Sequence, residues 1–252
     1  MTACSSASGE GQCNDLANQR FNADNNFQLS TGDQQGLDWR VPILSYILTA
    51  LGAYLLGSIP FGFLVAKAKG IDIRSVGSGN IGATNAMRVL GKPAGIFVLL
   101  MDAFKGYAAV WLCAVLLKNS AANAEIETLR VIAGIGAVLG HNYTCWLKFK
   151  GGKGIATTAG VYLALAPWPL LIALGVFIVA LVLTRIVSVA SISAAVALPV
   201  AVWLMMPQNL FLDIVTTALG VMAVYKHKSN IQRLMAGTEN KLGKKKSPEV
   251  AK

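Results

Sequence analysis

Four long runs without Asp, Glu, Lys or Arg limit what this chain can fold into. They cover residues 41–66, 131–147, 154–184 and 186–212. A helix needs about 20 apolar residues to cross a bilayer, and the runs lack the strict apolar–polar alternation of a membrane β-strand. Only 13% of the whole chain is charged. We therefore predict an all-α membrane protein, a polytopic helical bundle.

Positive charge predicts the orientation of this bundle. Basic residues gather around segment 77–92, around segment 148–153 and after residue 225, where a run of three lysines follows at 244–246. The positive-inside rule assigns all three places to the cytoplasm. The N-terminus and the loop 118–130 are then expected outside, and the C-terminus in the cytoplasm.

This orientation requires an even number of crossings between Lys153 and Lys226. Splitting the apolar run at Pro167-Trp168-Pro169 satisfies it, because proline interrupts helices and tryptophan favours the membrane interface. Seven spans result: 43–66, 93–117, 130–147, 155–166, 168–184, 186–206 and 210–225. The 155–166 helix would be only about 18 Å long, so five spans, with one segment in the interface, remain the alternative.

The sequence divides into three regions. Residues 1–40 are polar, carry two arginines against five carboxylates, and are expected to be a disordered extension. Residues 41–240 form the predicted membrane-embedded domain, and 241–252 a basic cytoplasmic tail. The cysteines (Cys4, Cys13, Cys113 and Cys145) have no CxxC spacing, so neither a metal nor another cofactor is expected.

Two glycine-rich segments predict anion binding. The first reads Gly77-Ser78-Gly79-Asn80-Ile81-Gly82-Ala83-Thr84-Asn85, and the second Phe149-Lys150-Gly151-Gly152-Lys153-Gly154. Glycine frees the backbone to turn N–H groups towards an anion, and lysine adds positive charge. A dinucleotide-binding site requires a strand before its glycines, and none is predicted before the first segment. The second segment lacks the Ser or Thr that follows the lysine of a P-loop. A tight turn between helices remains the simpler alternative.

Asp102 and Lys105 interrupt an apolar run three residues apart, so they should pair on one helix face. Such a pair either marks a functional site or is a structural ion pair in which the two charges neutralise each other. Of the two histidines, His141 is better explained as structural. Neither is followed by the Asp of a His-x4-Asp pair, because Trp146 and Gln232 occupy those positions.

These motifs together resemble the bacterial acyl-phosphate:glycerol-3-phosphate acyltransferase family, over residues 57–239. The resemblance rests on both glycine-rich segments, Gly140-His141 before the second, and a third segment from His227 to Glu239. It implies a seven-helix enzyme of the bacterial inner membrane with its site facing the cytoplasm. The enzyme would acylate the sn-1 hydroxyl of glycerol 3-phosphate with acyl phosphate, releasing lysophosphatidic acid and phosphate. Membrane lipid and the acyl-phosphate-producing enzyme are implied partners, and nucleic acid is not.

The resemblance also implies site residues. Those with catalytic roles would be Ser78, Arg88, Lys105, Ser188, His227 and Asn230. Those that bind substrate phosphate would be Asn80, Thr84, Asn85, Lys150, Gly151, Gly152, Lys153, Gly154 and Glu239. The proton of the attacking hydroxyl would pass to His227 or to the donor's own phosphate.

Two other classes of protein compete with an enzyme. A transporter built on broken helices would show two similar halves, and the sequence contains no such repeat. A non-catalytic assembly protein is disfavoured by the number of polar positions that match the family.

Overall fold

The computed structural model describes residues 40–117 and 123–242, and all its described elements are helical. They are α2 (Arg40–Ser58), α3 (Phe61–Ala68), α4 (Ala83–Leu90), α5 (Lys92–Leu117), α6 (Asn123–Asn142), the 3-10 turn η1 (Cys145–Leu147), α7 (Ile155–Leu165), α8 (Pro167–Thr184), α9 (Val187–Met205), α10 (Leu210–Lys226) and α11 (Lys228–Met235). The predicted extension before residue 40, with Cys4 and Cys13, and the tail after residue 242 lie outside the described residues.

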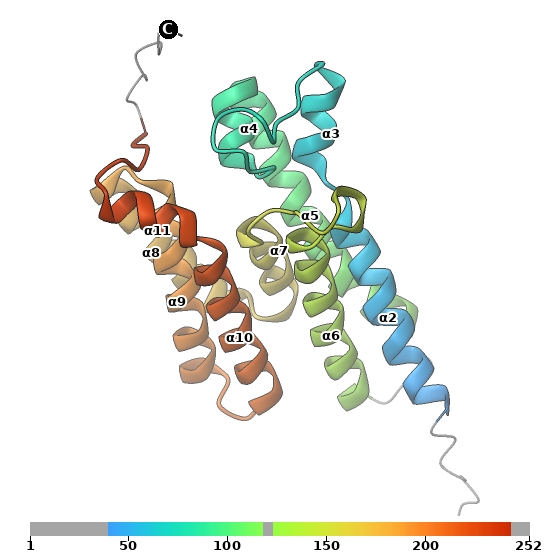
Figure 1. Ribbon diagram of the computed structural model, residues 1–252. Helices are drawn as coiled ribbons and strands as arrows, with labels where there is room; N and C mark the ends of the chain where they lie inside the picture. The colour runs from blue at the N-terminus through green and yellow to red at the C-terminus, as the bar shows by residue number, and fades with distance from the viewer. Residues whose placement is uncertain (1–39, 118–122, 243–252) are drawn as a thin grey trace, which may run out of the picture. The chain divides into compact units, whose positions relative to one another are not determined.

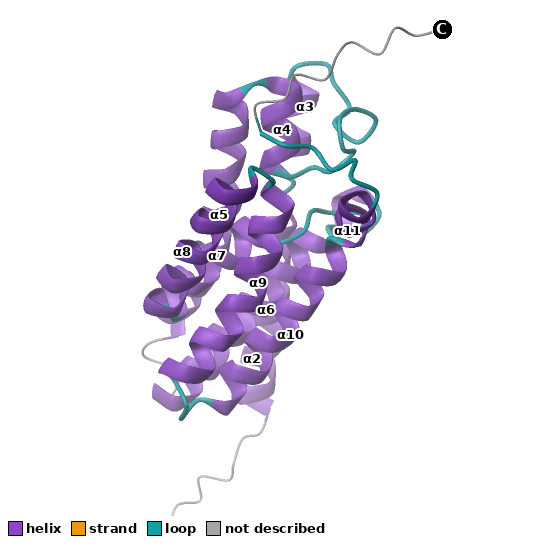
Figure 2. Ribbon diagram, turned by 90° about the vertical axis from the view of Figure 1, so that its left-hand side faces the viewer, coloured by secondary structure: helices purple, strands orange, loops and turns teal. Residues whose placement is uncertain are grey.

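The chain divides into two units between Leu44 and Ser45. Only Arg40–Leu44, the start of α2, is described in the first unit, and the second contains the rest of α2 and all later helices. Within the second unit α4 and α11 lie at the same end of the bundle (Figures 1 and 2).

Four described segments are long and apolar enough to cross a membrane: Ile43–Ala68, Lys92–Leu117, Pro167–Thr184 and Val187–Met205. The pair α10 and α11, bent by 53°, gives a fifth if it forms one span. These segments agree with the predicted spans to within about two residues, the usual uncertainty of helix ends. The all-α membrane fold is therefore confirmed, while the count of seven and the orientation of the termini stay predictions.

Prolines place two of the breaks in the bundle. Pro167 is the first residue of α8, a position whose N–H would have no acceptor within the helix, so proline costs no hydrogen bond there. The predicted split of the apolar run 154–184 at this proline is confirmed. Pro60 separates α2 from α3. The carbonyl groups that end α2 are bonded by side chains: Thr144 Oγ1 donates to Ser58 O at 2.6 Å, and Lys105 Nζ to Ile59 O at 2.8 Å.

The predicted span 130–147 is wrong at both ends. Helix α6 covers Asn123–Asn142, so part of the expected outer loop is helical. Two of its charged residues pair with each other, because Arg130 contacts Glu127 at 2.6 Å, and Arg130 also donates to Ala164 O. The helix stops early where the second glycine-rich segment takes over its last carbonyl groups.

Helix α5 packs against α3, α4, α6 and α7, while α9 packs between α8 and α10. Glycines bring α5 and α7 into backbone contact. A Cβ on Gly160 would lie 1.8 Å from Ala103 O, and one on Gly106 2.2 Å from Thr157 O. Because α7 leads out of the second glycine-rich segment, this contact fixes where that segment sits.

Candidate active site

A cavity of about 140 Å³ opens where four helices begin. Its lining includes N-cap or first-turn residues of α4 (Gly82, Ala83 and Thr84), α7 (Gly154, Ile155 and Ala156), α9 (Val187 and Ser188) and α11 (His227 and Asn230). A helix N-terminus carries unpaired N–H groups and about half a positive charge. Four of them around one space favour an anionic ligand.

The rest of the lining is mixed. It consists of Ser78, Asn80, Asn85, Arg88, Leu99, Asp102, His141, Lys153, Phe177, Ser191 and Glu239. Arg88 follows Thr84 by one helical turn, so both face the cavity from α4. Lys153 belongs to the second glycine-rich segment. Arg88 and Lys153 thus place two cations around the same cavity as the helix N-termini.

The first glycine-rich segment is held in shape by Asn85. Its Oδ1 accepts from Ser78 N at 2.8 Å, and its Nδ2 donates to the carbonyl groups of Ile73 and Val76. The side chain is buried, and Gly77 beside it has a φ of +63°. Because these bonds occupy the amide, Asn85 supports the wall of the cavity and offers a ligand little.

The second glycine-rich segment caps α6. Gly152 N donates to His141 O at 3.0 Å, and Gly151 N to Asn142 O at 3.3 Å. Gly152 does not have a left-handed φ, so the expectation that it supplies backbone freedom is wrong. A Cβ there would lie 2.0 Å from His141 Nε2. Glycine is required because the imidazole packs against it.

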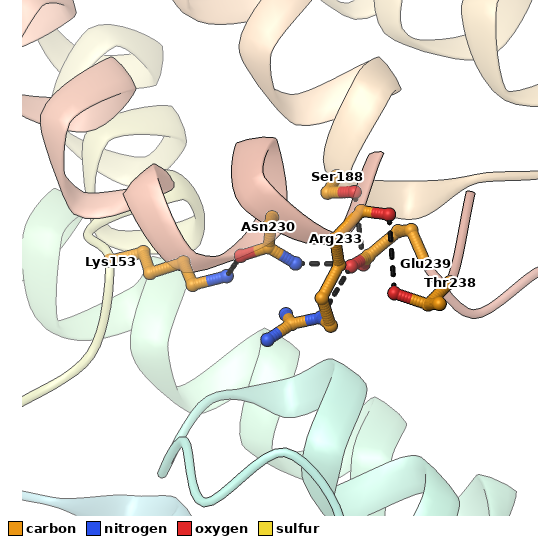
Figure 3. A network of polar contacts seen from close by, with 6 residues as sticks. All are labelled: Lys153, Ser188, Asn230, Arg233, Thr238 and Glu239. Atoms are coloured by element: carbon orange, nitrogen blue, oxygen red, sulfur yellow. Dashed lines mark hydrogen bonds and ion pairs between the residues drawn. The ribbon is translucent and has the colours of Figure 1, made fainter. Parts of the chain in front are cut away.

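Glu239 joins three parts of the site (Figure 3). It accepts from Ser188 Oγ at 3.1 Å, Asn230 Nδ2 at 2.8 Å and Arg233 Nε at 2.7 Å. Asn230 Oδ1 in turn accepts a hydrogen bond from Lys153 Nζ. The network connects the starts of α7, α9 and α11, so it sets the position of the Lys153 ammonium group.

This network also sets two pKa values. Burial would raise the pKa of Glu239, but the hydrogen bonds from Asn230, Arg233 and Ser188 outweigh it and lower the pKa below the ordinary value. Burial lowers the pKa of Lys153 to about 8, against the attraction of Glu239 and with the repulsion of Arg233 and Arg88. Lys153 is thus a cation at neutral pH that loses its charge in the mildly alkaline range.

His227 presents a hydrogen-bond acceptor to the cavity. Its Nδ1 lies 2.7 Å from Ala223 O. A carbonyl oxygen only accepts, so Nδ1 carries the hydrogen and a neutral ring has its lone pair on Nε2. The ring is 2% exposed and lines the cavity. It can therefore accept a hydrogen bond from a bound hydroxyl group.

Asp102 and Lys105 form the expected ion pair, at 2.8 Å. Asp102 Oδ1 also lies 3.5 Å from His141 Nδ1. His141 thus has a carboxylate partner, although it does not complete a His-x4-Asp pair. The partner comes from α5, and chain spacing around His141 could not reveal it.

Most of the predicted site residues meet at the cavity. Those that line it are Ser78, Asn80, Thr84, Asn85, Arg88, Lys153, Gly154, Ser188, His227, Asn230 and Glu239. Lys105, Lys150, Gly151 and Gly152 are not among the lining residues. Lys105 is buried against Asp102, and Lys150 is exposed.

Four polar residues of the site were not among the predicted site residues. Asp102 and His141 line the cavity, whereas Asp102 was predicted as one member of a functional or structural ion pair and His141 as structural; Arg233 holds Glu239. Ser191 also lines the cavity. It follows Ser188 by three residues, so the two share a helix face, and that spacing was the available signal.

An apolar cavity of about 90 Å³ adjoins the polar one. Both are lined by Ile155 and Phe177. The apolar cavity continues between α7, α8, α9 and α10 along side chains such as Leu174, Leu198 and Leu219. An anionic group and an attached apolar chain could thus occupy neighbouring spaces.

The fold and the site together define a helical integral membrane protein with a polar cavity that contains Arg88 and Lys153 at one end of its bundle. The family model described as glycerol-3-phosphate acyltransferase matches residues 47–237. A glycerol-3-phosphate acyltransferase of Desulforamulus reducens is 48% identical over 206 residues, covering 81% of this chain and 98% of the relative. One from Geotalea daltonii is 47% identical over 197 residues, covering 78% and 97%.

A solved structure has the same fold. The crystal structure of PlsY (YgiH), an integral membrane glycerol 3-phosphate acyltransferase in its glycerol 3-phosphate form, is similar with a TM-score of 0.71 and 36% identity. The match covers 79% of this chain and 96% of that chain. A lysophosphatidic acid form of PlsY gives a TM-score of 0.69. This chain belongs to the glycerol-3-phosphate acyltransferase family.

Proposed function

We propose that this protein transfers a fatty acyl group from acyl phosphate to the sn-1 hydroxyl of glycerol 3-phosphate in phospholipid biosynthesis. The observation that carries the proposal is the meeting of four helix N-termini with Arg88 and Lys153 around one cavity. Both substrates bear a phosphate group, and backbone N–H groups together with fixed cations are its preferred ligands. The PlsY structures in glycerol 3-phosphate and lysophosphatidic acid forms are relatives with a matching substrate and product.

The adjoining apolar cavity supports an acyl donor. The carbonyl carbon of the donor would lie near Ile155 and Phe177, which line both cavities. The acyl chain would continue between α7, α8, α9 and α10, while its phosphate stays among the polar groups. This arrangement holds the reacting carbonyl beside the cations that neutralise its leaving group.

In the reaction the sn-1 oxygen attacks the acyl carbon, an ester C–O bond forms, and the bond between the acyl carbon and the phosphate oxygen breaks. The proton of the hydroxyl group passes either to His227 Nε2 or directly to the departing phosphate. Arg88 and Lys153 would balance the charge on that phosphate. Ser78, Asn80 and Thr84 would contribute hydrogen bonds from the α4 side, and Ser188, Asn230 and Glu239 would hold Lys153 in place.

The proposed site faces the cytoplasm of a bacterial inner membrane, with the N-terminus outside and seven spans. The basic clusters at segments 148–153 and 226–233 support this orientation, since both lie at the site. In a variant without native cysteines, a cysteine at position 30 should react with an impermeant thiol reagent in intact cells. One at position 247 should react only after permeabilisation, and its labelling in intact cells would contradict the orientation.

The donor is expected to be acyl phosphate. Purified protein should form lysophosphatidic acid and phosphate from acyl phosphate and glycerol 3-phosphate, without added metal. A thioester lacks a phosphate on the reacting carbonyl, so it loses a charge-assisted interaction of about 1.5–3 kcal/mol. Acyl-CoA and acyl-carrier-protein should therefore react at least roughly tenfold more slowly. Efficient synthesis from a thioester, with no phosphate-exchanging enzyme present, would exclude this donor assignment.

Phosphate binding is expected to weaken at alkaline pH. The pKa of Lys153, lowered to about 8 by burial, means that the charged form is complete well below pH 8 and is lost above it. The KM for glycerol 3-phosphate should rise by up to about tenfold per pH unit above that value. Lys153→Arg keeps its charge throughout this range and should remove the rise. A KM that stays flat from about pH 7 to about pH 9.5 in the unaltered protein would contradict the assignment.

A further inference from the structure

In the wall of the cavity lies a buried array of three ionisable side chains: Lys105, Asp102 and His141, of which the last two line the cavity. Their exposed fractions are 1%, 3% and 5%. Lys105 Nζ donates to Asp102 at 2.8 Å and to Ile59 O at 2.8 Å, and Asp102 Oδ1 lies 3.5 Å from His141 Nδ1. The array thus connects α5 to the break between α2 and α3 and to the end of α6.

The side chain of His141 contacts the second glycine-rich segment at Gly152. The imidazole of His141 packs so closely against Gly152 that a Cβ there would meet Nε2 at 2.0 Å and Cε1 at 2.8 Å. The backbone of His141 reinforces this contact by accepting from Gly152 N at 3.0 Å. Lys153, the next residue, carries its ammonium group into the cavity. A movement of the His141 ring would therefore also move Lys153.

Charged groups inside a membrane protein are costly unless they have partners. A purely structural pair needs only Asp102 and Lys105, which already neutralise each other. His141 is the additional member, and its ring is in contact with Gly152. Because Nε2 faces Gly152 Cα, the ring is poorly placed to take a proton from a substrate, in contrast to His227.

We propose that His141, oriented by Asp102 and Lys105, is a positioning residue that sets the place of the second glycine-rich segment and, through it, of Lys153. The effect on substrate rests on the proposed function, because Lys153 is there assigned to phosphate. The positioning itself rests on the contacts above. The array fixes the floor of the cavity, and the Glu239 network fixes the lysine from the other side.

The test is a double-mutant cycle between His141 and Gly152. Gly152→Ala should lower kcat/KM for glycerol 3-phosphate by about tenfold or more, and His141→Ala by several-fold with the loss mainly in KM. Removing the ring makes room for the new methyl group. The double variant His141→Ala/Gly152→Ala should therefore be within about threefold of His141→Ala, far better than the product of the two single effects.

Gly151→Ala provides the matched control. A Cβ on Gly151 would lie 2.0 Å from the backbone oxygen of His141, which every substitution at position 141 retains. His141→Ala should therefore rescue Gly152→Ala and leave Gly151→Ala as damaging as before. His141→Asn, whose amide can replace Nδ1 as a partner of Asp102, should recover part of the activity and serves if the alanine variant is unstable.

A second cycle tests the route through Lys153. In a Lys153→Ala background, His141→Ala should add less than about twofold to the loss. Direct binding of glycerol 3-phosphate, measured by calorimetry on the solubilised protein, should show the same coupling without acyl transfer. Coupled binding without transfer would overturn the proposed function and keep the positioning role. Additive effects in both cycles, or a His141→Ala defect confined to kcat, would overturn the positioning role.

Discussion

Lys153→Ala should lower kcat/KM for glycerol 3-phosphate by roughly ten- to a hundredfold, because a charge-assisted hydrogen bond is worth about 1.5–3 kcal/mol. Lys153 lines the cavity and is held towards it by Asn230, which in turn is held by Glu239. The variant should remain folded, since the amine donates to a neutral amide and leaves no buried charge without a partner. Steady-state kinetics on purified protein of unchanged thermal stability would measure the loss.

Lys150→Ala is the matched control for this prediction. Lys150 belongs to the same glycine-rich segment and carries the same charge, yet it is exposed and does not line the cavity. Its removal should change kcat/KM by less than about twofold, the usual scale for an exposed charge. Equal losses in the two variants would mean that the general positive charge of the segment, and not the placed ammonium group, binds the phosphate.

The difference between the two lysines shows where sequence analysis stops. Composition and the lysine-rich motif predicted the anion site, and both lysines fitted it equally well. Only the fold distinguishes them, because the segment turns to cap α6 before α7 begins, and this turn sends Lys150 outwards and Lys153 inwards. Such a turn depends on contacts with His141 and Asn142 that lie outside the motif.

The fold itself could be predicted well wherever a local signal was strong. Apolar runs and prolines gave the ends of α7, α8 and α9 to within about two residues. The start of α6 was mispredicted because Glu127 and Arg130 were interpreted as loop residues, whereas they lie in the helix, where they pair with each other and Arg130 also donates to Ala164 O. The contact between Asp102 and His141 is also tertiary, so no periodicity could reveal it.

Gly160→Ala should destabilise the protein by about 1–3 kcal/mol or more, the cost of overpacking a close contact. The new methyl carbon would lie 1.8 Å from the backbone oxygen of Ala103. Neither backbone can yield without separating α5 from α7, which touch again at Gly106. Since α7 begins at the cavity with Ile155 and Ala156, activity should fall together with stability.

Gly175→Ala in α8 is the control for this change. A Cβ there would meet nothing within 4 Å, and alanine is favoured over glycine in a helix interior by up to about 1 kcal/mol. Thermal unfolding of the purified variants should give a lower Tm for Gly160→Ala and an unchanged or higher Tm for Gly175→Ala. Equal Tm values would show that α5 and α7 can move apart at little cost. The backbone contact between them would then not be what holds the second glycine-rich segment at the cavity.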